Sequence, residues 1–174
     1  LLDCGMRQGS AEMEAGNVDP FPFDVASLDA LVLSHAHIDH IGRVPLLVKR
    51  GFRGPIFAQQ ATADLMPIML LDSASLAESD AARFNRRRTH GEVEQQPLYT
   101  KDEVSDAMAL VRALPYDARQ PIVPGIEIAF RDAGHILGSS IVELWADGRK
   151  LVFSGDLGPT GTPILRDPTP IRDA

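Results

Sequence analysis

The sequence is short of cysteine, of long apolar runs and of positive charge, and each shortage narrows the class of protein. Cys4 is the single cysteine among 174 residues, which excludes an internal disulfide framework and suits a reducing compartment such as the cytoplasm. No apolar stretch approaches the roughly 18 residues of a membrane span. The formal net charge of −7 disfavours a general basic coat for nucleic acid, although it leaves room for a local basic groove.

The remaining composition is that of one folded domain. A hydrophobic content of 44% and a charged content of 24% are ordinary for a soluble globular protein of this size. Leu1–Gly5 has the pattern of the end of a buried strand, and residues 159–174 form a proline-rich run. We therefore expect a piece of a longer protein, so the lack of a targeting signal says little about location. Cys4 is expected to be a small buried hydrophobic residue.

The first two thirds of the chain alternate between strand-like and helix-like patterns. Residues 6–16 show no periodicity and are expected to be loop, and the polar stretch 78–96 fits either a second helix or a mobile arm. The predicted elements are a strand over residues 30–34, a short helix over 41–50, a strand over 55–58, a helix with Thr62 as N-cap, and a helix that begins at the capping box Thr100–Glu103 and carries Val104, Met108 and Val111.

From residue 125 the apolar pattern changes to a period of two. Residues 125–130, 140–145 and 149–154 alternate in the manner of strands, and Asp147-Gly148 is a strong two-residue hairpin turn between the last two. Helices and strands followed by antiparallel strands predict a layered α/β fold with a mixed sheet.

The segment from His35 to His40 is the most informative part of the chain. It follows the predicted strand 30–34 and holds three of the five histidines, together with Asp39. Residues i and i+2 of an extended chain point the same way, so His35 and His37 can face one ion. A turn after residue 38 would carry Asp39 and His40 to a second ion. Imidazole and carboxylate are ligands that Zn²⁺ accepts. A histidine-rich surface loop is the alternative, and the concentration of histidine in one window argues against it.

Two later segments each offer one further ligand at the end of a strand. His135 lies between Gly134 and Gly138, and Asp156 lies in a glycine-flanked turn. Glycine lets the backbone adopt positive φ and come close to a site. Taken alone, His135 would more often be structural and Asp156 would more often be a turn residue. Beside the first motif, we assign both to the metal site.

The basic run Arg86, Arg87 and Arg88 stands out in an acidic chain. A run of this length is usually a solvated helix face. The functional alternative is a weak RNA-binding contact to phosphate near the rim of the site. His90, just after the run, is expected to be a surface residue.

These motifs carry a resemblance to a known family. Residues 35–40 match the HxHxDH signature of the metallo-β-lactamase superfamily, and Leu2–Gly5 resembles its first, aspartate-bearing motif. The chain is similar to the β-CASP branch of RNA-processing nucleases, the bacterial and archaeal relatives of the pre-mRNA 3′-end cleavage endonuclease. That closer likeness rests on residues 40–47, 132–140 and 153–159, and on the insert that ends at residues 97–104.

The resemblance implies a fold and a ligand set. The fold would be an αββα sandwich, with residues 1–174 as its first part and a β-CASP domain after residue 174. The last metal-binding histidine would also lie there, so we expect the isolated chain to be inactive and to bind its second ion weakly. The implied roles are first-ion ligands for His35, His37 and His135, second-ion ligands for Asp39 and His40, a bridge for Asp156, and an orienting role for Asp3.

The resemblance further implies a function. It is a zinc-dependent phosphodiester hydrolase acting on single-stranded RNA, as an endonuclease or from the 5′ end, through a hydroxide held by two zinc ions. Asp39 and Asp156 are the predicted catalytic residues. The alternatives are a hydrolase of a small ester or thioester on the same fold, and a non-catalytic RNA-binding relative. No membrane partner is expected, and a homodimer stays open.

Overall fold

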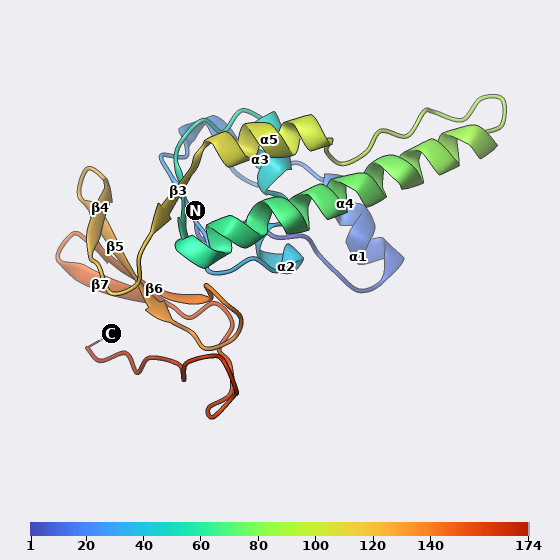
Figure 1. The fold of residues 1–174 in the computed structure, drawn as a ribbon. Coiled ribbons are helices and arrows are strands. Elements are labelled where there is room, and N and C mark those ends of the chain that lie inside the picture. The colour runs from blue at the N-terminus through green and yellow to red at the C-terminus, as the bar shows by residue number, and fades with distance from the viewer. Residues whose placement is uncertain (174) are drawn as a thin grey trace.

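The computed structural model describes residues 1–173, which form two β-sheets and a layer of helices (Figure 1). The first sheet is parallel, in the order β1-β2-β3, and Leu2 extends it through a bridge to Val32. Its strands are β1 (Leu31–Val32), β2 (Ile56–Gln59) and β3 (Val111–Leu114).

The second sheet is antiparallel, in the order β4-β5-β6-β7. Asp147 and Gly148 connect β6 to β7 with φ of 50° and 70°, as a hairpin turn with two left-handed residues requires. This confirms the predicted turn. The strands are β4 (Gln120–Val123), β5 (Ile126–Asp132), β6 (Ser140–Ala146) and β7 (Arg149–Phe153).

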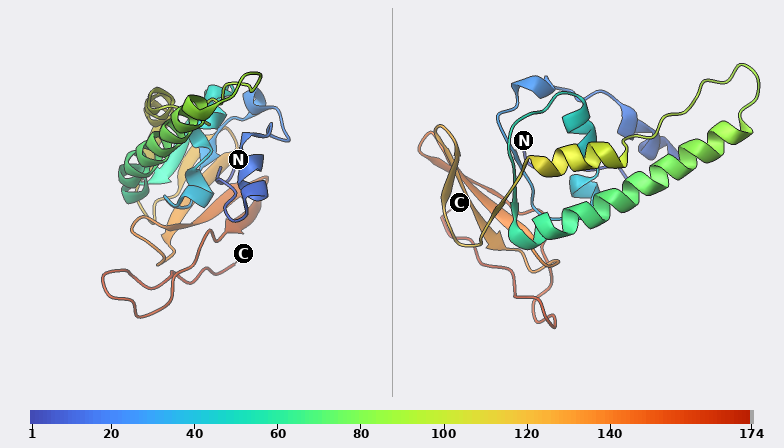
Figure 2. Two further views of the ribbon diagram at one scale, coloured as in Figure 1. Left: turned by 90° about the vertical axis from the view of Figure 1, so that its right-hand side faces the viewer. Right: turned by 45° about the horizontal axis from the view of Figure 1, so that its top comes forward.

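The helices lie on the face of the parallel sheet that points away from the second sheet, as the views of Figure 1 and Figure 2 agree. The prediction of an α/β fold with strands of both senses is confirmed, with the two senses divided between two sheets. No helix within residues 1–173 has the length and apolar character needed to cross a bilayer. The helices are α1 (Ala11–Ala15), η1 (Gly16–Val18), η2 (Val25–Ser27), α2 (Ile38–Ile41), α3 (Val44–Lys49), α4 (Gln60–Arg87) and α5 (Lys101–Ala109).

Alternation along β1 divides the core in two. Leu31 and Leu33 point to the helices and join the larger apolar cluster, which also contains Cys4 as predicted. Ala30 and Val32 point to the antiparallel sheet and join the smaller cluster. Because a strand turns successive side chains to opposite faces, this short apolar run packs against both neighbouring layers. The strand end that carries His35 is therefore fixed from both sides.

Several element boundaries differ from the prediction. The expected helix over residues 41–50 is present as α3, which is shorter, while Ile41 ends the separate helix α2. Residues 11–15 of the expected loop form α1. Val111 belongs to β3 rather than to the preceding helix, which ends at Ala109. The capping box of Thr100 and Glu103 is confirmed.

Thr62 is not the N-cap of α4. The side chain of Gln59 caps this helix by accepting a hydrogen bond from the amide of Ala61. Thr62 is fully buried in the first turn, and its hydroxyl donates to the carbonyl of Gly138 at 2.8 Å. The residue thus joins α4 to the loop that carries His135.

The polar stretch 78–96 is partly a continuation of α4. This helix runs for 28 residues and extends past the body of the molecule, after which the chain returns beside it (Figures 1 and 2). We call residues 77–99 the arm. The helical part of the arm is the last part of α4, which continues from the body of the molecule without a break.

Candidate metal centre

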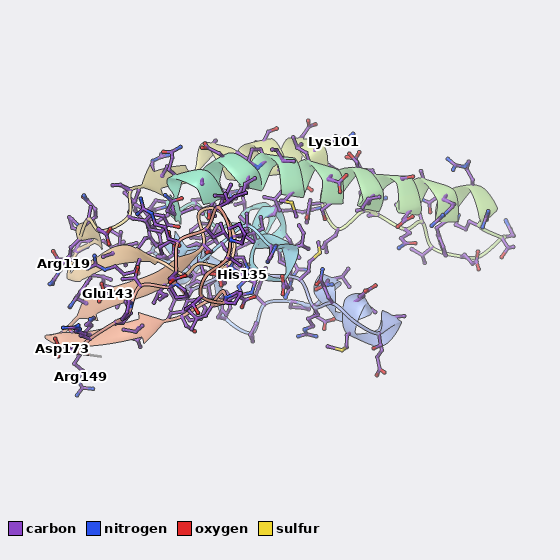
Figure 3. All side chains as sticks on the ribbon, turned by 60° about the horizontal axis from the view of Figure 1, so that its bottom comes forward. Lys101, Arg119, His135, Glu143, Arg149 and Asp173 are labelled. Carbon is purple, nitrogen blue, oxygen red and sulfur yellow. The ribbon has the colours of Figure 1, made fainter. Side chains whose placement is uncertain are left out.

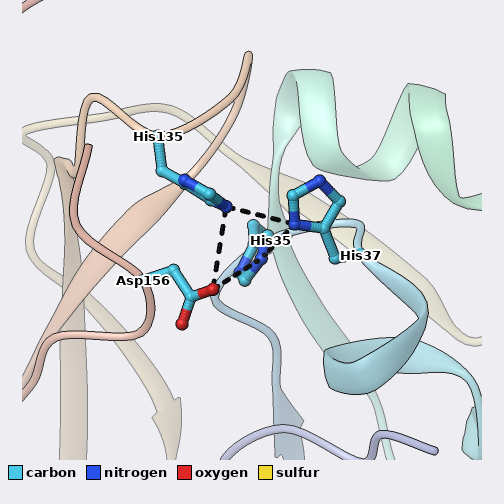
Figure 4. Close-up of side chains that lie close together, drawn as sticks. All are labelled: His35, His37, His135 and Asp156. Carbon is cyan, nitrogen blue, oxygen red and sulfur yellow. Dashed lines mark hydrogen bonds and ion pairs between the residues drawn. The ribbon is translucent and has the colours of Figure 1, made fainter. Parts of the chain in front are cut away.

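Four predicted ligands converge at the ends of strands (Figure 4). His35 follows β1, His37 precedes α2, His135 lies between β5 and β6, and Asp156 follows β7. One donor atom from each lies within 4.8 Å of the donor atoms of the other three. Three separate stretches of chain, more than 100 residues apart at the extremes, therefore meet at one point between the two sheets.

The distances are those of a compact donor cluster. His37 Nδ1 lies 3.0 Å from His35 Nε2 and 3.1 Å from His135 Nε2. Asp156 Oδ2 lies 3.9 Å from His35 Nε2 and 3.7 Å from His135 Nε2. Around a tetrahedral ion with bonds of about 2.0–2.1 Å, neighbouring ligand atoms are about 3.3 Å apart. The three nitrogens and the carboxylate oxygen fit a divalent cation of this kind after small movements.

A second donor group lies on the other side of Asp156. His40 Nε2 is 3.4 Å from Asp156 Oδ1 and 3.9 Å from Asp39 Oδ2. The two oxygens of Asp156 thus face different groups, one toward the three histidines and one toward His40. Asp39 and Asp156 remain about half exposed, with 48% and 42% of their side chains accessible, so the centre opens to solvent on this side.

Asp3 and Ser34 hold two of the imidazoles from behind. Asp3 accepts hydrogen bonds from the Ser34 amide and hydroxyl, both at 2.7 Å, and its Oδ2 lies 2.7 Å from His40 Nδ1. Ser34 Oγ lies 3.0 Å from His35 Nδ1. A carboxylate only accepts, so His40 carries its proton on Nδ1, and the serine oxygen can accept from His35 in the same way. Both Nε2 atoms are then free to bind a metal.

The surroundings shift the pKa values of these two histidines in opposite directions. Burial, supported by the neighbouring histidines, lowers the pKa of His35 to about 4. The hydrogen bond to Asp3 is the main cause of the raised pKa of His40. His35 is therefore neutral near pH 7 and can offer its lone pair without first losing a proton.

Glycine allows two of the close approaches that form the centre. Gly155 has a φ of 51°, and a Cβ there would lie 2.7 Å from the Cβ of Ser34. Gly138 has a φ of 83°, and a Cβ there would lie 2.4 Å from the amide nitrogen of Thr62. A real Cβ does not come this close to another heavy atom, so glycine is needed at both positions.

The loop that carries His135 is held by residues that sequence reasoning missed. Ser139 Oγ accepts from the amides of His135 and Ile136 at 3.0 and 3.2 Å. Tyr116 donates its hydroxyl to the carbonyl of Ser139 at 2.8 Å, and burial raises the pKa of Tyr116. Thr62 completes the set through Gly138. Tyr116 and Thr62 are remote in sequence from His135, and the N-cap signature of Thr62 points to a different role, so no local signal connected either residue to this loop.

Neither Cys4 nor the arginine run belongs to the donor cluster. Cys4 is buried in the core facing the helices, and burial raises the pKa of its thiol to about 12, so it is a neutral apolar residue. Arg86 and Arg87 end α4, and Arg88 follows. From Thr62 to Arg87 the helix rises by about 37 Å. The arginine run therefore lies far from the rim of the centre, where phosphate contact was predicted.

The chain matches a known family over its whole length. The sequence profile of the Metallo-beta-lactamase superfamily matches residues 1–174. Ribonuclease TTHA0252 of Thermus thermophilus is 39% identical over 99% of this chain and 36% of that protein. Transcription termination factor FttA of Cenarchaeum symbiosum is 33% identical over 90% of this chain and 23% of that protein.

A further relative and a solved structure support the same family and fold. An RNase J-like protein of Methanocaldococcus jannaschii is 31% identical over 90% of this chain and 30% of that protein. The chain thus spans between 23% and 36% of the length of these curated relatives. A metallo-β-lactamase with a HARLDQ motif from Cronobacter sakazakii has the same fold, with a TM-score of 0.51 and 22% identity over 94% of this chain and 54% of that one. The chain belongs to the metallo-β-lactamase superfamily.

Proposed function

We propose that this chain is the metal-binding part of a zinc-dependent phosphodiester hydrolase of the β-CASP branch, which cleaves single-stranded RNA. The observation that carries the proposal is the convergence of six metal-competent side chains in a chain whose relatives are named as ribonucleases and transcription termination factors. A β-CASP domain following residue 174 is part of the same proposal.

Within this proposal, His35, His37 and His135 would hold one zinc ion, Asp39 and His40 would hold a second, and Asp156 would contribute to both. The support is geometric: His37 Nδ1 lies 3.0 Å from His35 Nε2 and 3.1 Å from His135 Nε2. The carboxylate of Asp156 turns one oxygen toward each group. Zinc would supply a Lewis acid that makes water nucleophilic near neutral pH and stabilises charge on phosphate oxygens.

The chain's own residues would prepare that chemistry by fixing proton positions. Asp3 keeps the proton of His40 on Nδ1, and Ser34 accepts from Nδ1 of His35, so both Nε2 atoms stay unprotonated. Asp39 and Asp156 lie on the half-exposed side, where a phosphodiester can approach. Asp3 and Ser34 would thus orient the histidine ligands from behind, while Asp39 and Asp156 face the side from which the substrate would bind.

The test is cleavage of end-labelled single-stranded RNA by the complete protein in the presence of zinc. We expect internal fragments or mononucleotides with the unmodified protein and none with Asp39→Ala. Asp72→Ala is the matched control, because Asp72 is exposed in the middle of α4. Equal cleavage by Asp39→Ala would contradict the ligand assignment. No cleavage by the folded, zinc-loaded protein would contradict the ribonuclease proposal and favour a small ester or thioester as substrate.

A further inference from the structure

The end of the arm contains a hollow with a basic lining. Its volume is about 450 Å³, and Arg83, Phe84, Arg87 and Arg88 contribute to its wall. Arg83 and Phe84 lie one turn before Arg87 on α4, so they share one side of the helix with it, and Arg88 follows directly after the helix. The complete lining is Asp80, Arg83, Phe84, Arg87, Arg88, Glu92 and Gln95.

Most of the arginine charge at this end is not neutralised locally. Arg83 pairs with Asp80 at 2.7 Å. In the part of the chain that the structure describes, no carboxylate lies within 4 Å of the guanidinium of Arg86, Arg87 or Arg88. Arg87 and Arg88 line the hollow together with one carboxylate that has no arginine partner among the described residues, Glu92, and Arg86 lies outside the lining. The positive charge that remains would be neutralised by a bound polyanion.

Phe84 adds a second, independent feature that points to the kind of polyanion. It is 43% exposed although it lies in the wall of the hollow, so part of its ring is available to a ligand. Proteins that hold single-stranded nucleic acid combine a positive groove for the backbone with aromatic rings on which bases stack. A simple anion site needs the arginines but has no use for the ring.

Hydrogen bonds join the two sides of the arm and keep the hollow formed. Asn85 donates to the carbonyl of Gln95 and accepts from its amide, both at 2.9 Å. Nearer the body, Tyr99 donates to Ser73 Oγ at 2.9 Å. The helix and the returning chain are thus connected at both ends, so a ligand would not need to assemble the site.

We propose that this hollow is a separate binding site for single-stranded RNA, which holds the backbone on Arg87 and Arg88 and stacks one base on Phe84. The site rests on the proposed function, and it adds a second contact far from the metal centre. In Figure 3 the arm extends away from the body that holds His135. The rise of about 37 Å along α4 from Thr62, beside the His135 loop, to Arg87 corresponds to roughly eleven stacked nucleotides, at about 3.4 Å per nucleotide.

This separation predicts that the arm senses the length of the RNA. A 20-nucleotide RNA reaches both sites, whereas a five-nucleotide RNA and bis(p-nitrophenyl) phosphate reach only one. Arg87→Gln with Arg88→Gln should weaken binding of a 20-nucleotide oligouridylate about tenfold. The same pair of substitutions should make the slope of log K against log salt concentration shallower by about 1.4. Each phosphate contact on a single strand contributes about 0.7 to that slope. Phe84→Ala should weaken binding at least about fivefold.

The experiment is fluorescence anisotropy with labelled oligouridylates on the complete protein, at several salt concentrations. The charge-matched control is Arg149→Gln with Arg172→Gln, two exposed arginines. Arg149 lies on the opposite side of the molecule from the arm (Figure 3), and the carbonyl of Arg172 accepts a hydrogen bond from Lys150, the neighbour of Arg149. An equal loss of affinity in this control, or unchanged binding in the arm variant, would overturn the proposal. So would a loss of five-nucleotide binding as large as that for 20 nucleotides.

A second readout separates failure of this site from failure of the proposed function. Hydrolysis of bis(p-nitrophenyl) phosphate should be the same in the arm variants and the unmodified protein, because this substrate needs the metal centre alone. If the unmodified protein binds and cleaves RNA while the arm variants match it, only the arm site is contradicted. If the unmodified protein binds no RNA, both proposals fall. A partner protein on the arm is then the alternative.

Discussion

The metal centre and the arm are built in opposite ways. At the centre, Ser34 and His35 have no exposed surface, and Asp3 and Ser34 support His40 and His35 from behind. In the arm, exposed polar residues surround one helix and one returning segment, with few contacts to the body. Metal chemistry needs donor atoms held within fractions of an ångström, and this precision comes only from many simultaneous constraints. A contact to a flexible polymer needs charge and reach, which an extended arm supplies.

A matched pair of leucines gives the largest contrast between the two regions. Leu33, two residues before His35, is fully buried, whereas Leu76 at the base of the arm is 61% exposed. Leu33→Ala should lower the free energy of unfolding by about 2–5 kcal/mol because it leaves a cavity in the core. Leu76→Ala should change it by no more than about 0.5 kcal/mol.

Urea denaturation followed by circular dichroism measures both values. Equal losses of stability in the two variants would contradict the contrast, because they would mean that the arm is as tightly packed as the centre.

Asp3→Asn should produce the next largest effect, on metal affinity. Asparagine preserves the size of the side chain and tolerates the left-handed backbone, which has a φ of 51° at Asp3. Its amide nitrogen would donate to His40 Nδ1, so the imidazole proton would move to Nε2 and block the metal-binding atom. Zinc affinity should fall about 10- to 100-fold.

Competition with a chromogenic zinc chelator measures this affinity. The same affinity in Asp3→Asn and the unmodified protein would show that Asp3 only closes the backbone at the strand end.

Thr62→Val should produce the smallest effect. Valine keeps the shape of the side chain but removes the hydrogen bond to the carbonyl of Gly138, which also accepts from Ser140 at 3.1 Å. Because one partner remains, the loss of stability should be about 1 kcal/mol.

Thr62→Ser retains the hydroxyl and should recover much of that loss in thermal unfolding. Equal destabilisation by valine and serine would assign the role of Thr62 to packing of its methyl group, not to its hydrogen bond with the His135 loop.

The sequence predicted the centre well because its main signal is local. Three histidines and Asp39 lie within six residues, so their joint role needed no knowledge of distant contacts. His135 and Asp156 were found because glycines mark the strand ends that carry them. The prediction that these residues come together agrees with the distances in the structure. That they bind zinc remains a prediction.

The residues that support the metal centre, and some strands, could not be predicted from local sequence patterns. Thr62 has the sequence signature of an N-cap, but its partner, the Gly138 carbonyl, lies 76 residues away. Val111 continues a helical period, yet pairing with Ile56 places it in a strand, which is tertiary context overriding a local pattern. No strand is predicted over β4, which contains Pro121. Proline is tolerated there because β4 is an edge strand.

The most direct test of the account is the zinc content of the complete protein, measured by elemental analysis. The account predicts two equivalents in the unmodified protein and in His90→Ala, since His90 lies in the exposed arm. It predicts loss of at least one equivalent in His37→Ala, whose Nδ1 lies between the nitrogens of His35 and His135. Two equivalents retained by His37→Ala, or an equal loss in His90→Ala, would contradict the claim that this cluster is the metal centre.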